Sequence, residues 1–172
     1  MNRYTTFPSP IGRLVASAQD DELTRLGVAE ESSVNAGEHV AHSDDQLFSE
    51  LHDQLELYWE RKLRDFDIPV APSGTAFQMR VWSTLRTIRY GQTISYAELA
   101  GRIGQPAAVR AVGGANGANP IAIIIPCHRV IGSDGALSGY AGGVERKRTL
   151  LALEDALTAK MQAQDAQSLR IG

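Results

Sequence analysis

The chain holds one cysteine, Cys127, and a histidine, His128, follows it directly. A single thiol cannot form an internal disulfide or a four-thiolate zinc site. An imidazole beside a thiol can take the thiol proton and leave the nucleophilic thiolate, so the pair is a candidate nucleophile and base. For a bare Cys-His pair the alternative is a buried cysteine that packs as a small apolar side chain, because the apolar run 121–125 precedes it.

A carboxylate is the third candidate, on a helix that the sequence predicts over residues 144–157. Glu154 lies one turn after two leucines, so it shares their apolar face and needs a partner if it is buried. An ionised Glu154 would orient His128 and stabilise its charged form. The alternative is a surface Glu154 paired with Lys147 or Arg146, and the sequence leaves the two alternatives even.

Composition places the chain among soluble globular proteins, with 172 residues, 43% hydrophobic and 22% charged. No signal peptide is visible at the N-terminus, and the longest apolar run is far too short to span a bilayer. We therefore expect a cytoplasmic protein with no membrane partner, which one cysteine also favours.

Charge is unevenly distributed along the chain. Residues 1–73 carry 6 Lys/Arg against 14 Asp/Glu, a net charge of −8, and residues 74–172 carry 11 against 6, a net charge of +5. A basic half favours a polyanionic partner. A solvated face, or pairing between the halves, explains the asymmetry equally well.

A Pro/Gly-rich linker at residues 69–74 predicts two domains, 1–73 and 74–172. In the first domain, 12–18 and 23–28 are predicted strands of a hairpin, and residues 31–46 are predicted to be a loop. Leucines at i+4 spacing before Trp59 predict an amphipathic helix. Three histidines in this half, with no cysteine among them, do not favour a metal site.

The second domain has a helix-turn-helix outline. Thr75 with Gln78, and Ser95 with Glu98, have the spacing of capping boxes at the starts of two helices. A third helix is predicted from residue 106 to about 116, built largely of alanine and glycine, which permits close approach to another helix or to a nucleic-acid groove. One long cation, Arg110, projects from it and could reach a phosphate or the base stack, or else only cap a carbonyl.

Taken together, the motifs of the second domain resemble one family, the methylated-DNA–protein-cysteine methyltransferases, also called O6-alkylguanine-DNA alkyltransferases. The resemblance runs from residue 74 to 154. It rests on Gly74-Thr75, Phe77-Gln78, Val81-Trp82, Tyr90-Gly91, Ser95-Tyr96, Arg110-Ala111-Val112-Gly113, Asn116, Asn119-Pro120, Pro126-Cys127-His128-Arg129-Val130, Gly139-Tyr140 and Gly142-Gly143.

The resemblance implies a two-domain α/β fold. A small N-terminal α/β (RNase H-like) domain would precede a C-terminal helix-turn-helix (winged-helix-like) active domain. It also implies catalytic roles: Cys127 as the alkyl acceptor, His128 as the base acting through a bridging water, and Glu154 as the group that orients His128. Asn119 would connect the recognition helix to the active-site segment. With His128 and Glu154 in these roles, we expect a lowered pKa for Cys127.

Binding residues are implied in the same way. The base pocket would be lined by Tyr96, the Val130 carbonyl, Tyr140 and the backbone at Ala141, where some relatives have a hydroxyl residue. DNA would be contacted by Arg110, which fills the gap left by the flipped nucleotide, by the small residues Ala111 and Gly113, and by Arg89, which stands where a proline is usual.

The implied activity is repair of duplex DNA. An alkyl group moves irreversibly from O6-alkylguanine, and from O4-alkylthymine, to Cys127 after base flipping, once per protein molecule and with no cofactor and no metal. The implied partner is double-stranded DNA bound through the minor groove, by a protein that is monomeric in solution and can cooperate on DNA. The alternatives are a helix-turn-helix regulator without chemistry and a cysteine hydrolase.

Overall fold

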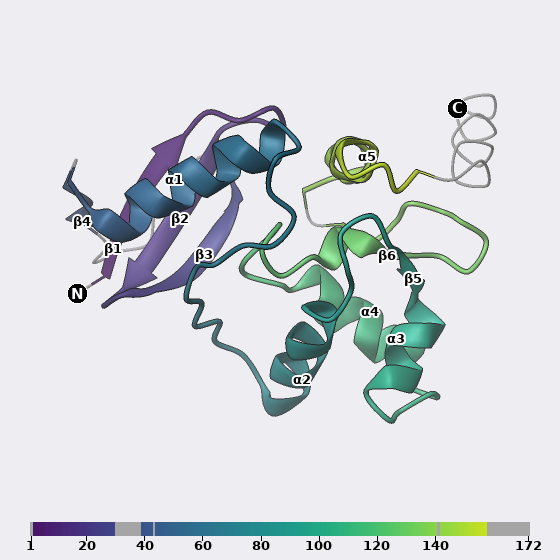
Figure 1. Ribbon diagram of the computed structural model, residues 1–172. Coiled ribbons are helices and arrows are strands. Elements are labelled where there is room, and N and C mark those ends of the chain that lie inside the picture. Colours follow the sequence, from purple (N-terminus) through teal and green to yellow (C-terminus); the bar gives the residue numbers. More distant parts are fainter. Residues whose placement is uncertain (1, 30–38, 43, 141, 158–172) are drawn as a thin grey trace. The chain divides into compact units, whose positions relative to one another are not determined.

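The computed structural model describes residues 2–29, 39–42, 44–140 and 142–157 (Figure 1). The chain separates into two compact units. One is formed by Met1–Ser73 together with Pro120–Ile124, and the other by Gly74–Asn119 together with Ile125–Gly172. Within the described ranges, no helix has the length and apolar character needed to cross a membrane.

The first unit is a four-stranded sheet with one helix against it (Figure 1). The strand order is β3-β2-β1-β4, where β1 is Asn2–Phe7, β2 is Leu14–Gln19, β3 is Glu22–Val28 and β4 is His39–Val40. The β2–β3 hairpin confirms the predicted pair of strands. Strand β1 was not predicted, and β4 falls in the segment predicted to be a loop, because neither has a clear alternation of apolar residues.

The helix of this unit, α1, spans Gln46–Trp59. Asp45 caps it, since the carboxylate accepts a hydrogen bond from the Phe48 amide at 3.1 Å. The leucines at i+4 spacing are buried, at positions 47, 51 and 55, as the sequence predicts. This stripe is the buried apolar face of the helix, which lies against the sheet (Figure 1).

The outer edge of β3 pairs with two segments that return from later in the chain. Leu23 bridges to Val70, and Leu26 bridges in parallel to Ile121. The Leu26 amide donates to the Pro120 carbonyl at 3.0 Å, and its carbonyl accepts from Ala122 at 2.8 Å. The segment Pro120–Ile124 therefore completes the sheet of the first unit, although it follows the helices of the second.

The second unit is mainly helical (Figure 1). Helix α2 (Ala76–Leu85) begins with both hydrogen bonds of the predicted capping box, between Thr75 and Gln78. The Trp82 indole N–H donates to the Ala115 carbonyl at 2.8 Å and so ties α2 to helix α4. A side chain at Gly74 would lie 2.5 Å from the Trp82 ring, which explains the glycine there.

Helices α3 (Tyr96–Arg102) and α4 (Val109–Gly117) form the helix-turn-helix. The Ser95 hydroxyl caps α3, and Gly104, with φ +78°, makes the turn between them. Helix α4 begins later than predicted, because residues 106–108 form a turn in place of the first helical turn. The two-stranded pair β5–β6 (Ile94–Ser95 with Val130–Ile131) and helix α5 (Val144–Leu153) complete the unit.

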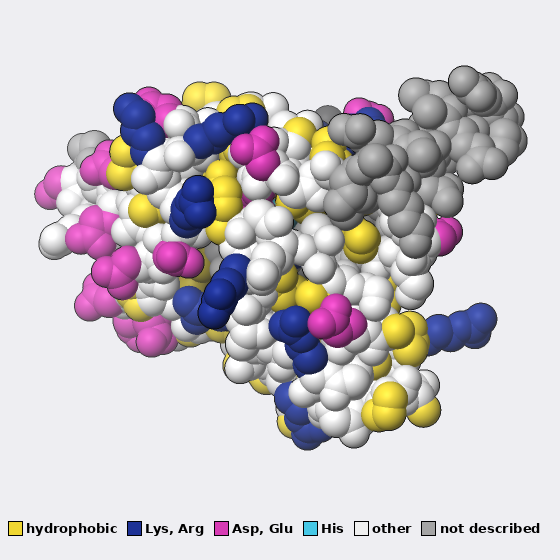
Figure 2. All heavy atoms as spheres, turned by 45° about the vertical axis from the view of Figure 1, so that its right-hand side comes forward, with side chains coloured by type: hydrophobic (Ala, Val, Ile, Leu, Met, Phe, Trp, Pro, Cys, Tyr) yellow, Lys and Arg dark blue, Asp and Glu magenta, His cyan; other side chains and the backbone are white. Residues whose placement is uncertain are grey.

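Surface charge follows the sequence pattern within each unit. On the face drawn in Figure 2, Asp and Glu side chains gather over the sheet unit at the left. Lys and Arg side chains lie at the upper left, across the centre and at the bottom of the same face, with one projecting at the right. Exposed basic residues such as Arg89 and Arg110 belong to the unit that carries the helix-turn-helix, whereas Arg129 and Lys147 of the same unit are buried.

Candidate active site

Two tight turns lead the chain into Cys127. The Ile124 amide donates to the Ala122 carbonyl at 2.8 Å, and the Cys127 amide donates to the Ile125 carbonyl at 2.8 Å. The residue at the centre of the first turn, Ile123, has φ +73°, a left-handed value that is a true outlier for a β-branched residue. Such backbone strain clusters at functional sites.

Cys127 opens a short 3-10 helix, η1 (Cys127–Arg129), and is buried. Two asparagine amides hold the carbonyls around it. The Asn119 side chain donates to the Ile125 carbonyl at 2.7 Å, and the Asn116 side chain donates to the Cys127 carbonyl at 3.3 Å. Both asparagines lie at or just beyond the end of α4, so this helix and the cysteine turn are joined through side-chain amides.

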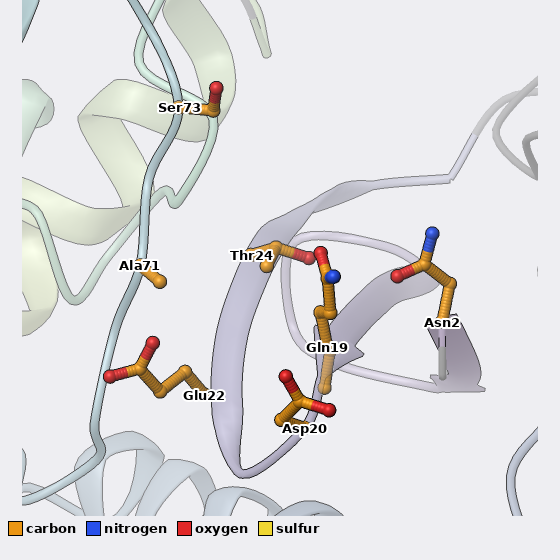
Figure 3. A pocket seen from close by; sticks show the side chains of 8 residues that line it. Asn2, Gln19, Asp20, Glu22, Thr24, Ala71 and Ser73 are labelled. Carbon is orange, nitrogen blue, oxygen red and sulfur yellow. The ribbon is translucent and has the colours of Figure 1, made fainter.

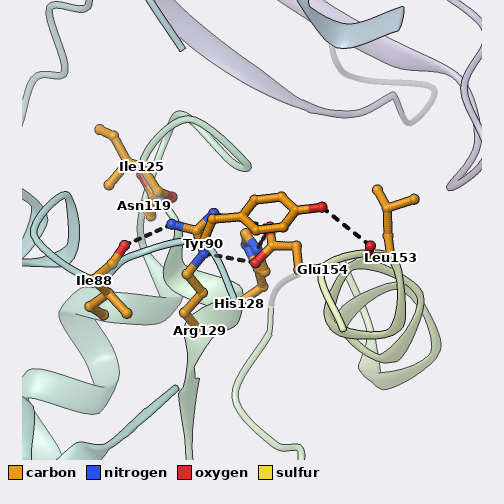
Figure 4. A network of polar contacts seen from close by, with 8 residues as sticks. All are labelled: Ile88, Tyr90, Asn119, Ile125, His128, Arg129, Leu153 and Glu154. Carbon is orange, nitrogen blue, oxygen red and sulfur yellow. Dashed lines mark hydrogen bonds and ion pairs between the residues drawn. The ribbon is translucent and has the colours of Figure 1, made fainter. Parts of the chain in front are cut away.

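A buried ionic network lies directly after the thiol (Figure 4). His128 Nε2 lies 2.8 Å from Glu154 Oε2, with both side chains fully buried. Arg129 donates to both oxygens of the same carboxylate, from Nε at 2.8 Å and from a terminal nitrogen at 3.1 Å. Its other terminal nitrogen donates to the Ile88 carbonyl at 2.7 Å. Glu154 is thus a buried, paired carboxylate, which settles the alternative that the sequence left open.

The network fixes the protonation of its members. Burial raises the pKa of Glu154, but His128 and Arg129 outweigh it and hold the pKa at about 2. Burial lowers the pKa of His128 in spite of the nearby carboxylate. A neutral His128 that donates from Nε2 to Glu154 keeps the lone pair on Nδ1, and this buried atom has no hydrogen-bond partner in the described part of the chain.

The expected lowering of the Cys127 pKa is wrong for this structure. Burial raises the pKa of the thiol, and a hydrogen bond from Asn119 and the charge of Lys147 oppose that rise without reversing it. The expectation assumed that a charged His128 would stabilise the thiolate. The same burial that encloses the thiol also keeps the imidazole neutral, so the resting thiol is protonated.

Of the residues predicted to line the base pocket, Tyr96, Val130 and Tyr140 lie near this turn. The Tyr96 hydroxyl donates to the Ser138 carbonyl at 2.7 Å, and the Val130 amide donates to the Cys127 carbonyl. Burial raises the pKa of Tyr140, and the charge of Cys127 adds to the rise. Ala141 lies outside the described residues. Tyr96 and Tyr140 therefore flank the same buried region as the thiol.

The four residues predicted to contact DNA lie on the surface of the helical unit. Arg110 and Ala111 are exposed on α4, and Gly113 is half-buried. Arg89, between α2 and α3, is also exposed. A side chain at Gly113 would lie 3.9 Å from the Tyr96 ring, so α4 is smooth on the side that approaches Tyr96.

A separate hollow of about 310 Å³ occurs in the sheet unit (Figure 3). It is lined by Asn2, Ala18, Gln19, Asp20, Glu22, Thr24, Ala71 and Ser73. None of these is a predicted site residue, and none is a thiol or an imidazole. Among the described residues no group of three His, Cys, Asp or Glu side chains could hold a metal ion.

Comparison with known proteins assigns the family. The model of the 6-O-methylguanine DNA methyltransferase ribonuclease-like domain matches residues 2–72, and that of the DNA binding domain matches residues 76–156. Together they cover both units. The chain belongs to the 6-O-methylguanine DNA methyltransferase family.

Individual members of this family are similar over most of their length. A methylated-DNA–protein-cysteine methyltransferase of Mycobacterium tuberculosis is 50% identical over 154 residues, 90% of this chain and 93% of the relative. The constitutive enzyme of Bacillus subtilis is 42% identical over 158 residues, 90% and 96% of the two chains. The crystal structure of M. tuberculosis OGT in complex with DNA has a TM-score of 0.83 at 47% identity, covering 92% of this chain and 97% of that one.

Three residues lie in the site that the sequence did not predict to belong to it. Arg129 completes the Glu154 network, Asn116 holds the Cys127 carbonyl, and Lys147 is buried beside the same turn. Lys147 could have been found, because positions 147, 150, 151 and 154 share one face of a helix. Arg129 follows His128 inside a buried segment, where a charge requires a partner.

Gly139 gives a direct test of the pocket wall. It has φ +74°, and a Cβ there would lie 2.6 Å from the Tyr96 hydroxyl. Gly104 has φ +78° with open space around it, so it is a matched control for backbone strain alone. We expect Gly139→Ala to lower the free energy of unfolding by ~1–3 kcal/mol more than Gly104→Ala, because overlap adds to strain. Urea unfolding measures both, and equal losses would contradict the predicted overlap.

Proposed function

We propose that this protein repairs alkylated DNA by moving an alkyl group from O6 of guanine to Sγ of Cys127. One observation carries the proposal: the only cysteine of the chain is buried beside His128, whose Nε2 is held by the buried Glu154 carboxylate. The substrate class comes from the family and from its similar members, which are methylated-DNA–protein-cysteine methyltransferases, one of them solved in complex with DNA.

The reaction is a single displacement. The Cys127 proton passes through a bridging water to Nδ1 of His128, whose Nε2–H remains bound to Glu154. The sulfur attacks the alkyl carbon, a C–S bond forms, and the C–O bond breaks with its electron pair going to guanine. Guanine then takes up a proton. O4-alkylthymine presents the same kind of leaving group, so the same displacement applies to it.

The base pocket would hold guanine between Tyr96, Tyr140 and the backbone at Val130 and Ala141. In the structure the Tyr96 hydroxyl donates a hydrogen bond to the Ser138 carbonyl. It must give up this hydrogen bond before it can donate one to guanine. The Asn119 amide supports the approach of the thiol by holding the Ile125 carbonyl. These roles concern binding and orientation.

DNA would be bound through its minor groove by α4. The small residues Ala111 and Gly113 allow close approach, and Arg110 would fill the space of the extruded nucleotide. Arg89 would contact a phosphate. We further propose that the protein is monomeric in solution and can cooperate on DNA.

Stoichiometry tests this function. The product would be a thioether, a poor leaving group, and the chain holds no second thiol to attack it. We therefore expect one methyl group to be transferred per molecule from a duplex containing O6-methylguanine, in a single burst with no cofactor added. Label transferred to protein is counted, with Cys127→Ser as the control that should accept none. Turnover beyond one would contradict the mechanism, DNA binding without transfer would favour the regulator, and acylation by an activated ester would favour the hydrolase.

A further inference from the structure

Lys147 is a buried charged side chain to which the mechanism above gives no role. It lies on α5, is fully buried, and takes part in none of the ion pairs formed among the described residues. Burial of a cation without a carboxylate is costly. A lysine kept there needs some other group that stabilises its charge.

The Lys147 ammonium binds backbone carbonyls at the edge of the thiol site. Nζ donates to the Val130 carbonyl at 2.5 Å and to the Ser138 carbonyl at 2.8 Å, and lies 5.8 Å from the centre of the Tyr96 ring. The Val130 amide in turn donates to the Cys127 carbonyl. The ammonium is thus connected to the backbone of Cys127 through one residue, Val130, and two hydrogen bonds.

The other cation of the site is already neutralised. Arg129 is bonded to both oxygens of Glu154, and His128 is kept neutral by burial. Burial lowers the pKa of Lys147 to about 8, and the charge of Cys127 opposes the fall. Conversely, the charge of Lys147 opposes the rise that burial causes in the pKa of Cys127. The titratable groups that interact with the amine are Cys127 and His128 on η1 and Tyr96 on α3.

We propose that Lys147 is a positioning residue for alkyl transfer. Its ammonium is held by hydrogen bonds to the Val130 and Ser138 carbonyls, and its positive charge stabilises the Cys127 thiolate as that thiolate forms. The reaction itself rests on the proposed function, but the thiol–amine pair can be tested without DNA. The thiol proton leaves as described above, and Lys147 stays protonated throughout. Once the sulfur has become a neutral thioether, the ammonium has lost its counter-charge.

The first test compares Lys147→Met with Arg148→Met. Both remove one positive charge from α5, but Arg148 is half-buried and paired with the exposed Glu145, whereas Lys147 is fully buried. The rate of Cys127 alkylation by iodoacetamide is measured from pH 6 to 10. We expect Lys147→Met to shift the curve of alkylation rate against pH by about one pH unit toward higher pH. The rate at pH 7 should then fall about tenfold, because the fraction of Cys127 present as thiolate falls. Arg148→Met should match the wild type. A wild-type profile in Lys147→Met would overturn the proposal.

A second measurement applies if Lys147→Met does not fold. The Lys147 ammonium is titrated by NMR in the wild type and in Cys127→Ser. We expect it to titrate at lower pH in Cys127→Ser, because the negative charge that Cys127 acquires as the pH rises, and that raises the Lys147 pKa in the wild type, cannot form. An unchanged midpoint would overturn the proposal. Failure of methyl transfer from DNA would instead contradict the proposed function, and neither measurement here uses DNA.

Discussion

Replacing Glu154 by glutamine is expected to lower the free energy of unfolding at pH 7 by about 3–5 kcal/mol. The change removes the carboxylate that pairs with Arg129 among the described residues, and the Arg129 charge, only 6% exposed, stays buried. Urea unfolding measures the loss. Glu145→Gln is the matched control on α5, since Glu145 is largely exposed and pairs with Arg148, and we expect it to change stability by less than about 0.5 kcal/mol.

The pH dependence of the free energy of unfolding of the same two variants separates the loss of the Glu154 charge from the change in side-chain shape. The folded pKa of Glu154 is about 2, below its usual 4.5, so its contribution is complete above about pH 4.5 and is lost as the pH falls toward 2. A shift of this size corresponds to on the order of 3 kcal/mol. Wild type and Glu145→Gln should lose this stability in acid, and Glu154→Gln should not. If the free energy of unfolding falls in parallel with decreasing pH for the wild type and both variants, the result would contradict the buried network.

Replacing Arg110 by alanine is expected to slow repair of duplex DNA about 100-fold, while reaction with free O6-alkylguanine base changes less than about twofold. Extruding a base from the stack costs a few kcal/mol, and only the duplex requires it. Arg110 is exposed on α4, so its removal should leave the fold intact. Single-turnover rates on the two substrates measure the ratio.

Arg89→Ala is the matched control for charge. It also removes one exposed arginine, but a phosphate contact should weaken binding to damaged and undamaged duplex alike and reduce the salt slope by about one. Equal slowing of both substrates by Arg110→Ala would show that Arg110 supports the fold and not base extrusion. A duplex-specific loss in Arg89→Ala of the same size would show that charge alone explains the effect.

Local patterns of the sequence predict much of the fold. The Thr75–Gln78 capping box forms with both hydrogen bonds, the β2–β3 hairpin is present, and the two-domain α/β class with a helix-turn-helix is confirmed. These features depend on residues close in the chain. Pairing of Pro120–Ile124 with β3 depends on residues about a hundred positions apart, and no local pattern encodes it.

The candidate site shows the same division. The resemblance places Cys127, His128 and Glu154 in the site, and the structure brings His128 and Glu154 within 2.8 Å. The Cys127 pKa could not be predicted, because burial decides its direction and depends on the whole fold. Lys147 was missed for another reason: it was considered only as a possible surface partner of Glu154, although its helical spacing places it on the buried face.

The central claim is that Cys127 accepts the alkyl group. The most direct measurement is the mass of the peptide that contains Cys127, after the protein has reacted with a duplex containing O6-methylguanine. We predict that this peptide gains the mass of one methyl group on sulfur in nearly every molecule, and that the guanine is restored. An unmodified Cys127 peptide with restored guanine, or a methyl group on any other residue, would contradict the account.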